Sequence, residues 1–246
     1  MVKVHFEKKF ITLMPEITTQ IKIIIADDHP LFRGAISRTI ADLINSEQQK
    51  TTVFEAQSVD DVYRLLEKDD DFDLVLLDVH FPGTNGLAGL ANLRGCFPLV
   101  PIAMITGSDS SDIVALSEEL GASGFLSKSD HPEVIAQAIN ALLIGDNWFP
   151  DIGAAPKDAI NREVGEVAEK IASLTPAQFK IFTLVCEGLL NKQIAYELDI
   201  TENTVKTHLS NIFAKFNVRK RTSLIILANL LNSDNNDDEL IRAEIE

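Results

Sequence analysis

The chain has little cysteine and no long hydrophobic run. It contains two cysteines in 246 residues, Cys96 and Cys186, far apart in the sequence, so we expect reduced thiols in the core and no disulfide framework. The longest apolar stretches, such as residues 224–231, are much shorter than the roughly 18 residues that a membrane span needs. Residues 1–20 lack the hydrophobic segment of a secretory signal. We therefore predict a cytoplasmic protein with no membrane partner.

The net charge of −15 argues against nucleic acid as a partner, but the charge is unevenly distributed. Residues 1–150 carry 11 Lys/Arg against 22 Asp/Glu, whereas residues 173–224 carry seven against four. The basic segment is therefore a candidate DNA-binding module within an acidic chain. Residues 233–246 are again acidic, with one Arg against six Asp/Glu. We interpret them as a disordered, solubilising tail, and a role in shielding the basic segment from DNA stays open.

Polar residues follow predicted β-strands at four places. Hydrophobic runs alternate with helical patterns from Ile21 onward, which predicts an α/β fold with a parallel sheet. In an open parallel sheet, ligands bind beyond the carboxyl ends of the strands. We therefore expect one site to be formed by the polar residues at the ends of these runs, which are Asp27 with Asp28, Asp78, Thr106 and Lys128.

The acidic members of this group predict a metal. Three carboxylates placed close together disfavour one another's ionisation, and a hard divalent cation such as Mg²⁺, which takes oxygen ligands, resolves that conflict. A metal, an exposed carboxylate, a hydroxyl and an ammonium group make a phosphoryl-accepting pocket. Asp27 and Asp28 taken alone would be read as a solvated pair at a helix N-cap. The other three residues favour the functional interpretation.

This pattern resembles the receiver domain of bacterial two-component response regulators over about residues 20–145. The resemblance implies a doubly wound, five-stranded parallel sheet of the flavodoxin-like type, with Asp78 as the phospho-acceptor. It also implies that Asp28, Asp78 and the backbone carbonyl of His80 ligate Mg²⁺, and that Asp27 acts on the metal through water.

The same resemblance assigns the remaining pocket residues. Thr106 and Lys128 would bind the phosphoryl oxygens, and Phe125 would be the switch aromatic. Judged from the sequence alone, Phe125 is about equally well explained as a core residue. The family often has Met where this chain has Phe81, an apolar exchange that leaves the pocket intact.

Helical spacing of apolar residues predicts buried faces for the first and last helices of this domain. The expected buried residues of the first helix are Phe32, Ile36, Ile40 and Leu43. Those of the last helix are Val134, Ile135, Ala138, Ile139, Leu142 and Leu143. Shorter helices are expected near residues 59–68, 87–94 and 111–120.

The C-terminal segment has the pattern of a helix-turn-helix. Thr175 and Gln178 form a predicted capping box, a short helix follows Gly188, and Thr201 opens an amphipathic helix. Over residues 174–221 the segment resembles the LuxR-type DNA-binding domain of NarL/FixJ-like regulators. The matching residues are Leu174-Thr175-Pro176, Gly188, Asn191-Lys192-Gln193-Ile194-Ala195, Leu198, Ile200, Thr204-Val205-Lys206-Thr207-His208, Asn211-Ile212, Lys215 and Val218.

The amphipathic helix that begins at Thr201 is the predicted recognition helix. Lys206, Thr207 and Ser210 lie opposite its apolar residues, where Lys can read a guanine edge and Thr a thymine methyl group. The predicted DNA contacts are Lys192, Thr204, Lys206, Thr207, His208, Ser210, Lys215 and Lys220. Those expected to touch phosphates rather than bases are Lys192, His208, Lys215 and Lys220, with Arg219 and Arg221 beside them.

These patterns divide the chain into five segments. They are an N-terminal extension (1–19), a receiver domain (20–146), a linker (147–172), a second, smaller all-α helix-turn-helix domain (173–232) and an acidic tail (233–246). Met14 precedes the first strand at a distance usual for the family, so residues 1–13 are a candidate dispensable extension.

The two resemblances together imply a phosphorylation-activated transcriptional regulator that is not an enzyme in the turnover sense. Its expected partners are a sensor histidine kinase, double-stranded DNA and, after phosphorylation, a second copy of the chain. An aspartyl-phosphate phosphatase of the haloacid-dehalogenase type needs an acid two residues after its nucleophile, where this chain has His80. A ligand-sensing LuxR regulator would lack the set formed by Asp27, Asp28, Asp78 and Lys128. A phosphorylation-independent response regulator stays open.

Overall fold

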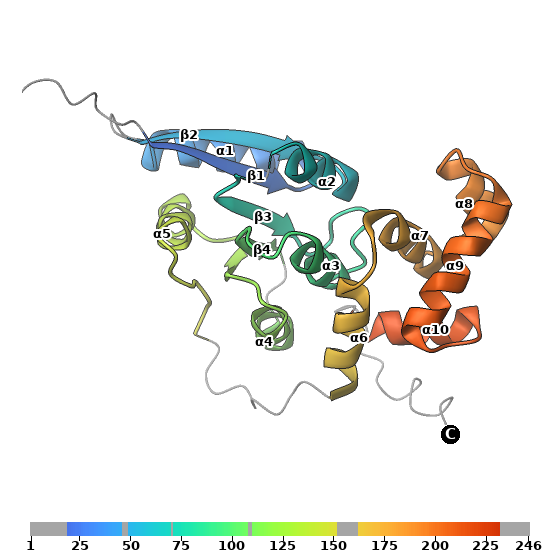
Figure 1. Cartoon of the computed structure of the whole chain (residues 1–246). Coiled ribbons are helices and arrows are strands. Elements are labelled where there is room, and N and C mark those ends of the chain that lie inside the picture. The colour runs from blue at the N-terminus through green and yellow to red at the C-terminus, as the bar shows by residue number, and fades with distance from the viewer. Residues whose placement is uncertain (1–18, 46–48, 70, 108–109, 152–161, 232–246) are drawn as a thin grey trace, which may run out of the picture.

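A parallel five-stranded sheet forms the N-terminal half of the molecule (Figure 1). The computed structural model describes residues 19–231 except 46–48, 70, 108–109 and 152–161. The acidic tail and all of the predicted N-terminal extension except Thr19, which begins β1, lie outside the described residues, as does Met14. The strand order is β2-β1-β3-β4-β5. The strands are β1 (Thr19–Ala26), β2 (Gln49–Ala56), β3 (Leu74–Asp78), β4 (Ile102–Thr106) and β5 (Gly124–Ser127).

Helices cover both faces of the sheet, which confirms the doubly wound α/β fold. One face packs against α1 (Pro30–Leu43) and α5 (Pro132–Leu143), and the other against α2 (Val59–Lys68), α3 (Ala88–Cys96) and α4 (Ser111–Glu119). Alternate residues of β1 serve the two faces: Ile23 and Ile25 join the core with α1 and α5, and Ile24 joins the opposite core. Strands β3, β4 and β5 are buried throughout, as expected for a parallel sheet covered on both sides.

The buried faces of α1 and α5 differ in part from the prediction. Leu43, the last residue of α1, is 48% exposed, because the following Ile44 takes the place in the core. Val134 is 36% exposed at the start of α5, where it lines a surface cavity. Arg33 is buried in α1 at a position that the apolar pattern did not predict.

Five further helices make up the C-terminal part of the described chain. They are α6 (Arg162–Ala172), α7 (Pro176–Cys186), α8 (Asn191–Glu197), α9 (Glu202–Phe216) and α10 (Arg221–Asn229). Thr175 and Gln178 form the expected capping box at the start of α7, and the Thr201 side chain caps α9. Phe182 stacks between Phe179 and Phe216 at ring-centroid distances of 6.0 and 5.5 Å, which joins α7 to α9.

The described parts of the segment between the two halves pack against the sheet and its helices. Helix α6 packs against α3 (Figure 1) and buries Val167, Ala168 and Ile171 in the core that α2, α3 and α4 share. Trp148 pairs with β5, because its carbonyl accepts from Phe125 N–H at 2.7 Å and its N–H donates to the Ser123 carbonyl at 3.2 Å. The chain after α5 therefore lies along β5, which is an edge strand of the sheet.

Both cysteines are free and half-buried, in agreement with the expected reduced thiols. Burial raises the pKa of Cys96 above its usual range and raises the pKa of Cys186 to about 12. Both thiols therefore stay protonated and weakly nucleophilic near neutral pH. Among the described helices, none is long and apolar enough to cross a membrane.

Candidate phosphoryl-acceptor site and helix-turn-helix

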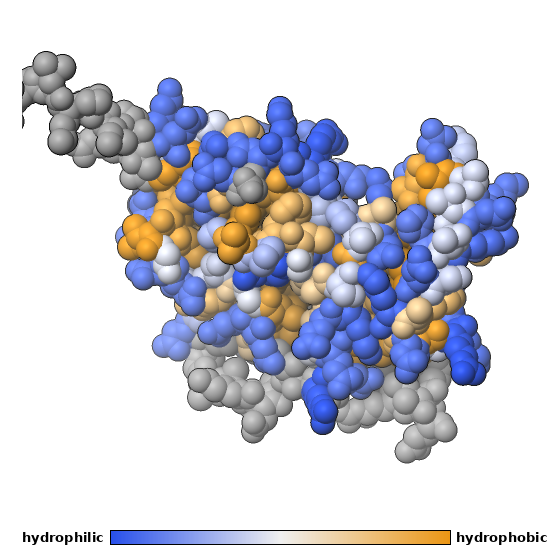
Figure 2. Space-filling view, viewed as in Figure 1, coloured by the Kyte–Doolittle hydropathy of each residue, from blue (hydrophilic) through white to orange (hydrophobic). Residues whose placement is uncertain are grey.

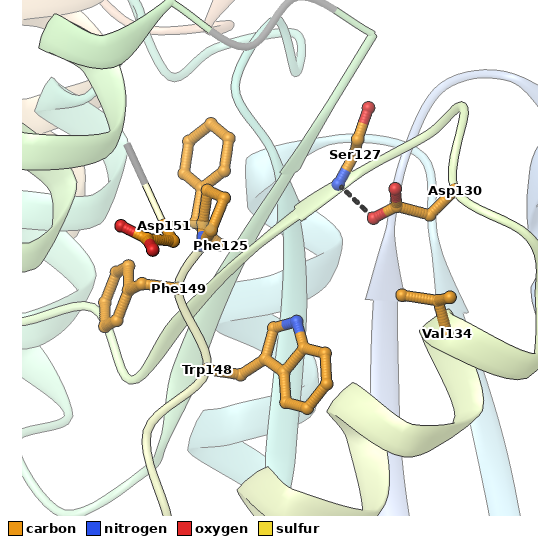
Figure 3. A pocket seen from close by; sticks show the side chains of 8 residues that line it. Phe125, Ser127, Asp130, Val134, Trp148, Phe149 and Asp151 are labelled. Carbon is orange, nitrogen blue, oxygen red and sulfur yellow. Dashed lines mark hydrogen bonds between the residues drawn. The ribbon is translucent and has the colours of Figure 1, made fainter. Parts of the chain in front are cut away.

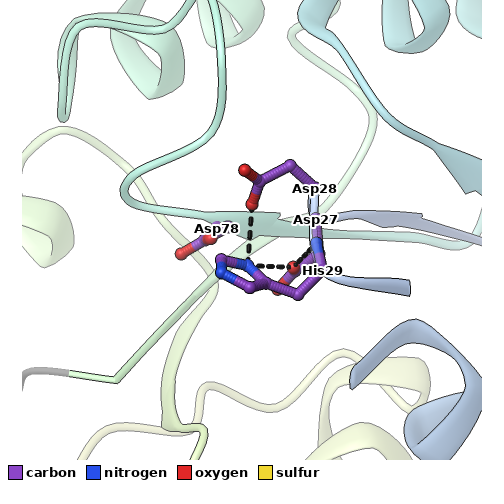
Figure 4. A group of neighbouring side chains, drawn as sticks. All are labelled: Asp27, Asp28, His29 and Asp78. Carbon is purple, nitrogen blue, oxygen red and sulfur yellow. Dashed lines mark hydrogen bonds and ion pairs between the residues drawn. The ribbon is translucent and has the colours of Figure 1, made fainter. Parts of the chain in front are cut away.

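Three carboxylates meet at the carboxyl edge of the sheet. Strands β1 and β3 are parallel neighbours with Ala26 opposite Leu77, so Asp27 and Asp78 end up side by side. Potential ligand atoms of Asp27, Asp28, His29 and Asp78 all lie within 4.8 Å of one another (Figure 4). Asp27 and Asp78 are buried, whereas the Asp28 carboxylate is partly open to solvent.

Lys128 brings a positive charge to this group from the end of β5. Its Nζ atom lies 2.6 Å from Asp27 Oδ2 and 2.7 Å from Asp78 Oδ2, and 5.0 Å from the centre of the Phe32 ring. Burial alone would lower the Lys128 pKa, but the two carboxylates outweigh burial and hold that pKa above its usual value. Lys128 therefore remains an ammonium group at any physiological pH.

The cluster has the donor chemistry of a site for a hard divalent cation. Three carboxylates against one ammonium group leave an excess of negative charge, which a dication with oxygen ligands matches. Asp27 Oδ2 is buried and, within the described part of the chain, receives no hydrogen bond of good geometry, although Lys128 lies beside it. The residues therefore fit Mg²⁺.

His29 contacts both acids that precede it in the sequence. Its Nδ1 is 2.7 Å from Asp28 Oδ1 and 3.1 Å from Asp27 Oδ1, and its backbone N–H donates to Asp27 Oδ1 at 2.7 Å. The ring is two-thirds exposed, so it lies at the mouth of the site (Figure 4). His80 follows β3, and its N–H donates to Asp78 Oδ1 at 3.3 Å.

Thr106 lies on β4, the neighbour of β3, and Phe125 lies on β5, at the edge of the sheet beyond β4. Thr106 is fully buried at the end of β4, opposite Ser127 of β5, and its carbonyl accepts from the Lys128 N–H at 2.7 Å. Phe125 is 1% exposed and belongs to the core on the α2–α4 side. The sheet register thus places Thr106 and Lys128 at the same edge as the three acids.

A cavity of about 330 Å³ lies beside Phe125 (Figure 3). Its walls include Phe125, Trp148 and Phe149, with Asp130 from the turn before α5. Trp148 is the only tryptophan of the chain. The cavity gives the Phe125 ring a neighbouring space, and the fluorescent Trp148 lines the same cavity while its ring packs on the opposite face of the sheet (Figure 3).

Sequence reasoning missed Arg33 and Glu55. Arg33 Nε donates to Glu55 Oε2 at 2.7 Å and Nη1 donates to the Asp27 carbonyl at 2.7 Å. The sequence pattern does not point to a buried arginine here, because an arginine between Phe32 and Ile36 on an amphipathic helix is ordinarily a surface residue.

The predicted recognition helix α9 presents polar residues to solvent. Lys206, Thr207 and Ser210 are exposed, while Val205, Leu209 and Ile212 are buried against the other helices. Lys206 pairs with Glu202 at 2.9 Å across one turn. Figure 2 shows a largely hydrophilic surface over α9. Lys192 and Lys220 are also exposed, whereas Thr204 and His208 are half-buried.

Two basic residues that were assigned to DNA phosphates make contacts within the fold. Lys215 Nζ donates to the Ser173 carbonyl at 2.6 Å and to Gln178 Oε1 at 2.9 Å. The Arg221 guanidinium donates to the carbonyls of Val185, at 3.2 Å, and Leu189 near the end of α7. The sequence could not predict these contacts, since both partners of each come from distant segments.

The C-terminal helices dock on the face of α2 and α3. The buried Asn92 side chain of α3 donates to the carbonyls of Ile171 and Leu174 at 2.7 and 2.9 Å, and it accepts from the Tyr63 hydroxyl. A Cβ atom on Gly95 would lie 2.1 Å from the Ala172 carbonyl, so only glycine allows α6 to approach this closely.

Two more contacts connect the docked helices to the loop that follows Asp78. Thr183 of α7 donates to the Gly83 carbonyl at 3.2 Å, and the Leu87 N–H donates to the Leu231 carbonyl at 3.2 Å. Lys180 of α7 also pairs with Asp60 of α2. The loop between β3 and α3 thus joins the acidic cluster to the C-terminal helices.

Comparison with known proteins agrees with both halves of this structure. Residues 23–140 match the family model described as the response regulator receiver domain, and residues 172–228 match that of bacterial regulatory proteins of the luxR family. The glycerol metabolism activator of Pseudomonas putida is 39% identical over 212 residues, covering 84% of this chain and 94% of that protein.

Two further proteins are similar over most of their length. The nitrate/nitrite response regulator NarP of Escherichia coli K12 is 36% identical over 216 residues, covering 87% of this chain and 96% of that protein. A structure of the RcsB response regulator of Salmonella typhimurium is 22% identical with a TM-score of 0.48, covering 84% and 96% of the two chains. The chain therefore belongs to the response regulators that join a receiver domain to a LuxR-type DNA-binding domain, and it is a DNA-binding transcriptional regulator of that family.

Proposed function

We propose that Asp78 is the residue through which this regulator receives its signal, as the acceptor of a phosphoryl group from a sensor histidine kinase or a small phosphodonor. The observation that carries this proposal is the convergence of Asp27, Asp28 and Asp78 with Lys128 at the carboxyl edge of the sheet. The edge is open to solvent at Asp28, so a donor can approach there.

The transfer requires a carboxylate nucleophile and compensation of phosphoryl charge. An oxygen of Asp78 attacks phosphorus, the bond from phosphorus to the donor's nitrogen or oxygen breaks, and an acyl phosphate forms on Asp78. Lys128, already 2.7 Å from Asp78 Oδ2, is placed to neutralise the transferred oxygens together with Thr106. Because the acyl phosphate persists as the signal, the protein is not an enzyme in the turnover sense.

Magnesium is the cofactor that the acidic cluster would hold. Asp28, Asp78 and the His80 carbonyl would be direct ligands, and Asp27 would act through water. Mg²⁺ bound there supplies positive charge that neutralises the phosphoryl oxygens. Lys128 and the buried Asp27 keep the acceptor carboxylate oriented toward the open edge.

Phosphorylation adds about −1.5 to −2 charge at Asp78, and we propose that the pocket rearranges around it. Thr106 moves toward the new oxygens, and Phe125 fills the space that Thr106 leaves. The loop after β3 changes with the acceptor, and its contacts with Thr183 and Leu231 transmit the change to the C-terminal helices. The docked and released arrangements are two populations whose balance phosphorylation shifts.

Release of the docked helices is the proposed route to DNA binding. In the docked state the basic helices stay attached to an acidic receiver, which repels DNA. Once released, two copies of the chain would pair and place their recognition helices in successive major grooves of double-stranded DNA. Lys206, Thr207 and Ser210 would read bases. Lys192, Thr204, His208 and Lys220 would hold the backbone, as would Lys215 if its contacts with Ser173 and Gln178 open.

We propose the division into a receiver (20–146) and a helix-turn-helix domain (173–232), joined by residues 147–172, with flanking segments 1–19 and 233–246. Helix α6 within the joining segment belongs to the docking surface. The protein acts in the cytoplasm, where its DNA target lies.

Phosphate-affinity electrophoresis tests the proposal. After incubation with acetyl phosphate and Mg²⁺, the wild-type chain should give a retarded band and Asp78→Asn should not. Asp146→Asn, an exposed acid after α5, is the matched control and should behave as wild type. Equal retardation of Asp78→Asn would place the phosphoryl group elsewhere, and no retardation of the wild type would favour a phosphorylation-independent regulator.

A further inference from the structure

Arg33 is a buried charge in a helix that is otherwise amphipathic. It lies in the first turns of α1 and is 3% exposed, among the apolar residues Ile36 and Ile40. A buried guanidinium costs free energy unless it is paired and hydrogen-bonded. Its contacts therefore show what it does in this fold.

The Arg33 guanidinium joins three elements at the acidic edge of the sheet. Its Nε donates to Oε2 of Glu55, near the end of β2, and its Nη1 donates to the main-chain carbonyl of Asp27, each at 2.7 Å. The planar fork of arginine holds two acceptors in fixed directions, which a lysine ammonium does not do.

Hydrogen bonds hold both polar backbone atoms of Asp27 and also its carboxylate. Its N–H donates to the Ala56 carbonyl at 3.3 Å, its carbonyl accepts from Arg33, and its carboxylate accepts from the His29 N–H at 2.7 Å. The peptide between Asp27 and Asp28 therefore has one orientation. That orientation directs both carboxylates toward Asp78 (Figure 4).

We propose that Arg33, held by Glu55, is a positioning residue for the metal and phosphoryl site. By holding the Asp27 carbonyl, it orients the peptide that carries the acid pair, so that Asp27, Asp28 and Asp78 can share one divalent cation. The inference rests on the proposed Mg²⁺ site. It adds a pair of residues that touch neither metal nor phosphate and act through the main chain of Asp27.

The alternative is that Arg33 and Glu55 only stabilise the fold. A purely structural pair would change the melting temperature without changing the affinity for Mg²⁺ of the protein that remains folded. Hydrogen-bond partners behind metal ligands typically contribute about 10–100-fold to metal affinity. The dissociation constant of Mg²⁺, rather than activity, is therefore the discriminating measurement.

Four variants of the full chain separate these explanations. Arg33→Met removes both hydrogen bonds and keeps the volume, Arg33→Lys keeps the charge but not the fork, and Glu55→Gln keeps an acceptor without the charge. Arg38→Met is the matched control on the same helix, since Arg38 is 84% exposed and pairs only with Asp42 among the described residues.

Isothermal titration with Mg²⁺ alone, with a melting curve of each variant with and without Mg²⁺, gives the outcome. We expect Arg33→Met to weaken Mg²⁺ binding by about 10-fold or more, Arg33→Lys and Glu55→Gln to lie between it and the wild type, and Arg38→Met to match the wild type. The melting-temperature gain from Mg²⁺ should shrink in the same order.

The proposal is overturned if folded Arg33→Met binds Mg²⁺ within twofold of the wild type. Should Arg33→Met not fold, wild-type affinity in both Arg33→Lys and Glu55→Gln overturns it equally. Failure of the underlying function looks different: the wild type itself would bind no Mg²⁺, or Asp28→Ala would bind it undiminished.

Discussion

Removing the Asn92 side chain should loosen the docked arrangement of the two domains. Asn92→Ala removes one donor each from the carbonyls of Ile171 and Leu174, and it removes the acceptor of the Tyr63 hydroxyl. The Ile171 carbonyl keeps its bond from the Leu174 N–H at 3.0 Å. In the released state the two carbonyls can bond water instead, so the substitution destabilises only the docked state. The variant therefore shifts the equilibrium between docked and released populations toward release.

The size of the shift follows from the two hydrogen bonds that cross the interface. A neutral hydrogen bond contributes about 0.5–1.5 kcal/mol net, so losing both should cost the docked state about 1–3 kcal/mol, or about 5–150-fold in the docking equilibrium. The Tyr63 contact lies within the receiver and is present in both states. It therefore adds little to the shift.

Small-angle scattering and DNA binding of the unphosphorylated protein measure this effect together. Asn92→Ala should have a larger radius of gyration than the wild type, and it should bind DNA more tightly without any phosphodonor. Asn140→Ala removes an exposed asparagine of α5 and should change neither quantity. If Asn92→Ala opened the molecule without raising DNA affinity, docking would not restrain the DNA-binding domain. If it changed neither, these bonds would not hold the domains together.

Three other predictions concern the metal, the recognition helix and the switch. Asp28→Ala should abolish Mg²⁺ binding in a calorimetric titration, and undiminished binding would place the metal elsewhere. Lys206→Ala should cost about 1–3 kcal/mol of DNA-binding free energy and relax specificity at one base position, whereas Lys220→Ala should weaken binding to all sequences alike and reduce the salt slope by about one. Competition against a randomised DNA library at two salt concentrations separates the two effects. The reverse result would mean that α9 lies on DNA in another orientation than the one proposed. Trp148 fluorescence should change on phosphorylation, because Trp148 shares a cavity with Phe125, and an unchanged spectrum would make Phe125 a static core residue.

The architecture of the receiver and its acidic edge could be predicted because short-range signals determine them. Hydrophobic runs that end in Asp27, Asp78, Thr106 and Lys128 imply parallel strands, and parallel strands bring their carboxyl ends to one edge. The helix-turn-helix could be predicted for the same reason, since Thr201 caps α9 through a local contact.

The contacts that could not be predicted are those between distant segments. Nothing near Asn92 in the sequence indicates that its side-chain amide donates hydrogen bonds to carbonyls about 80 residues later. Lys215 looks like a phosphate ligand until Ser173 and Gln178 are seen beside it. Arg33 looks like a surface residue until the end of β2 brings Glu55 to it. Each depends on how elements pack, which the local pattern does not encode.

DNA affinity with and without phosphorylation of Asp78 tests the central claim most directly. The DNA is the sequence that the protein enriches from a randomised library, and fluorescence anisotropy measures binding before and after acetyl phosphate with Mg²⁺. The wild type should bind more tightly after phosphorylation, and Asp78→Asn should bind with the same affinity in both conditions. A wild-type affinity that does not respond to the phosphodonor, or an Asp78→Asn affinity that rises as much as the wild type's, would contradict the account.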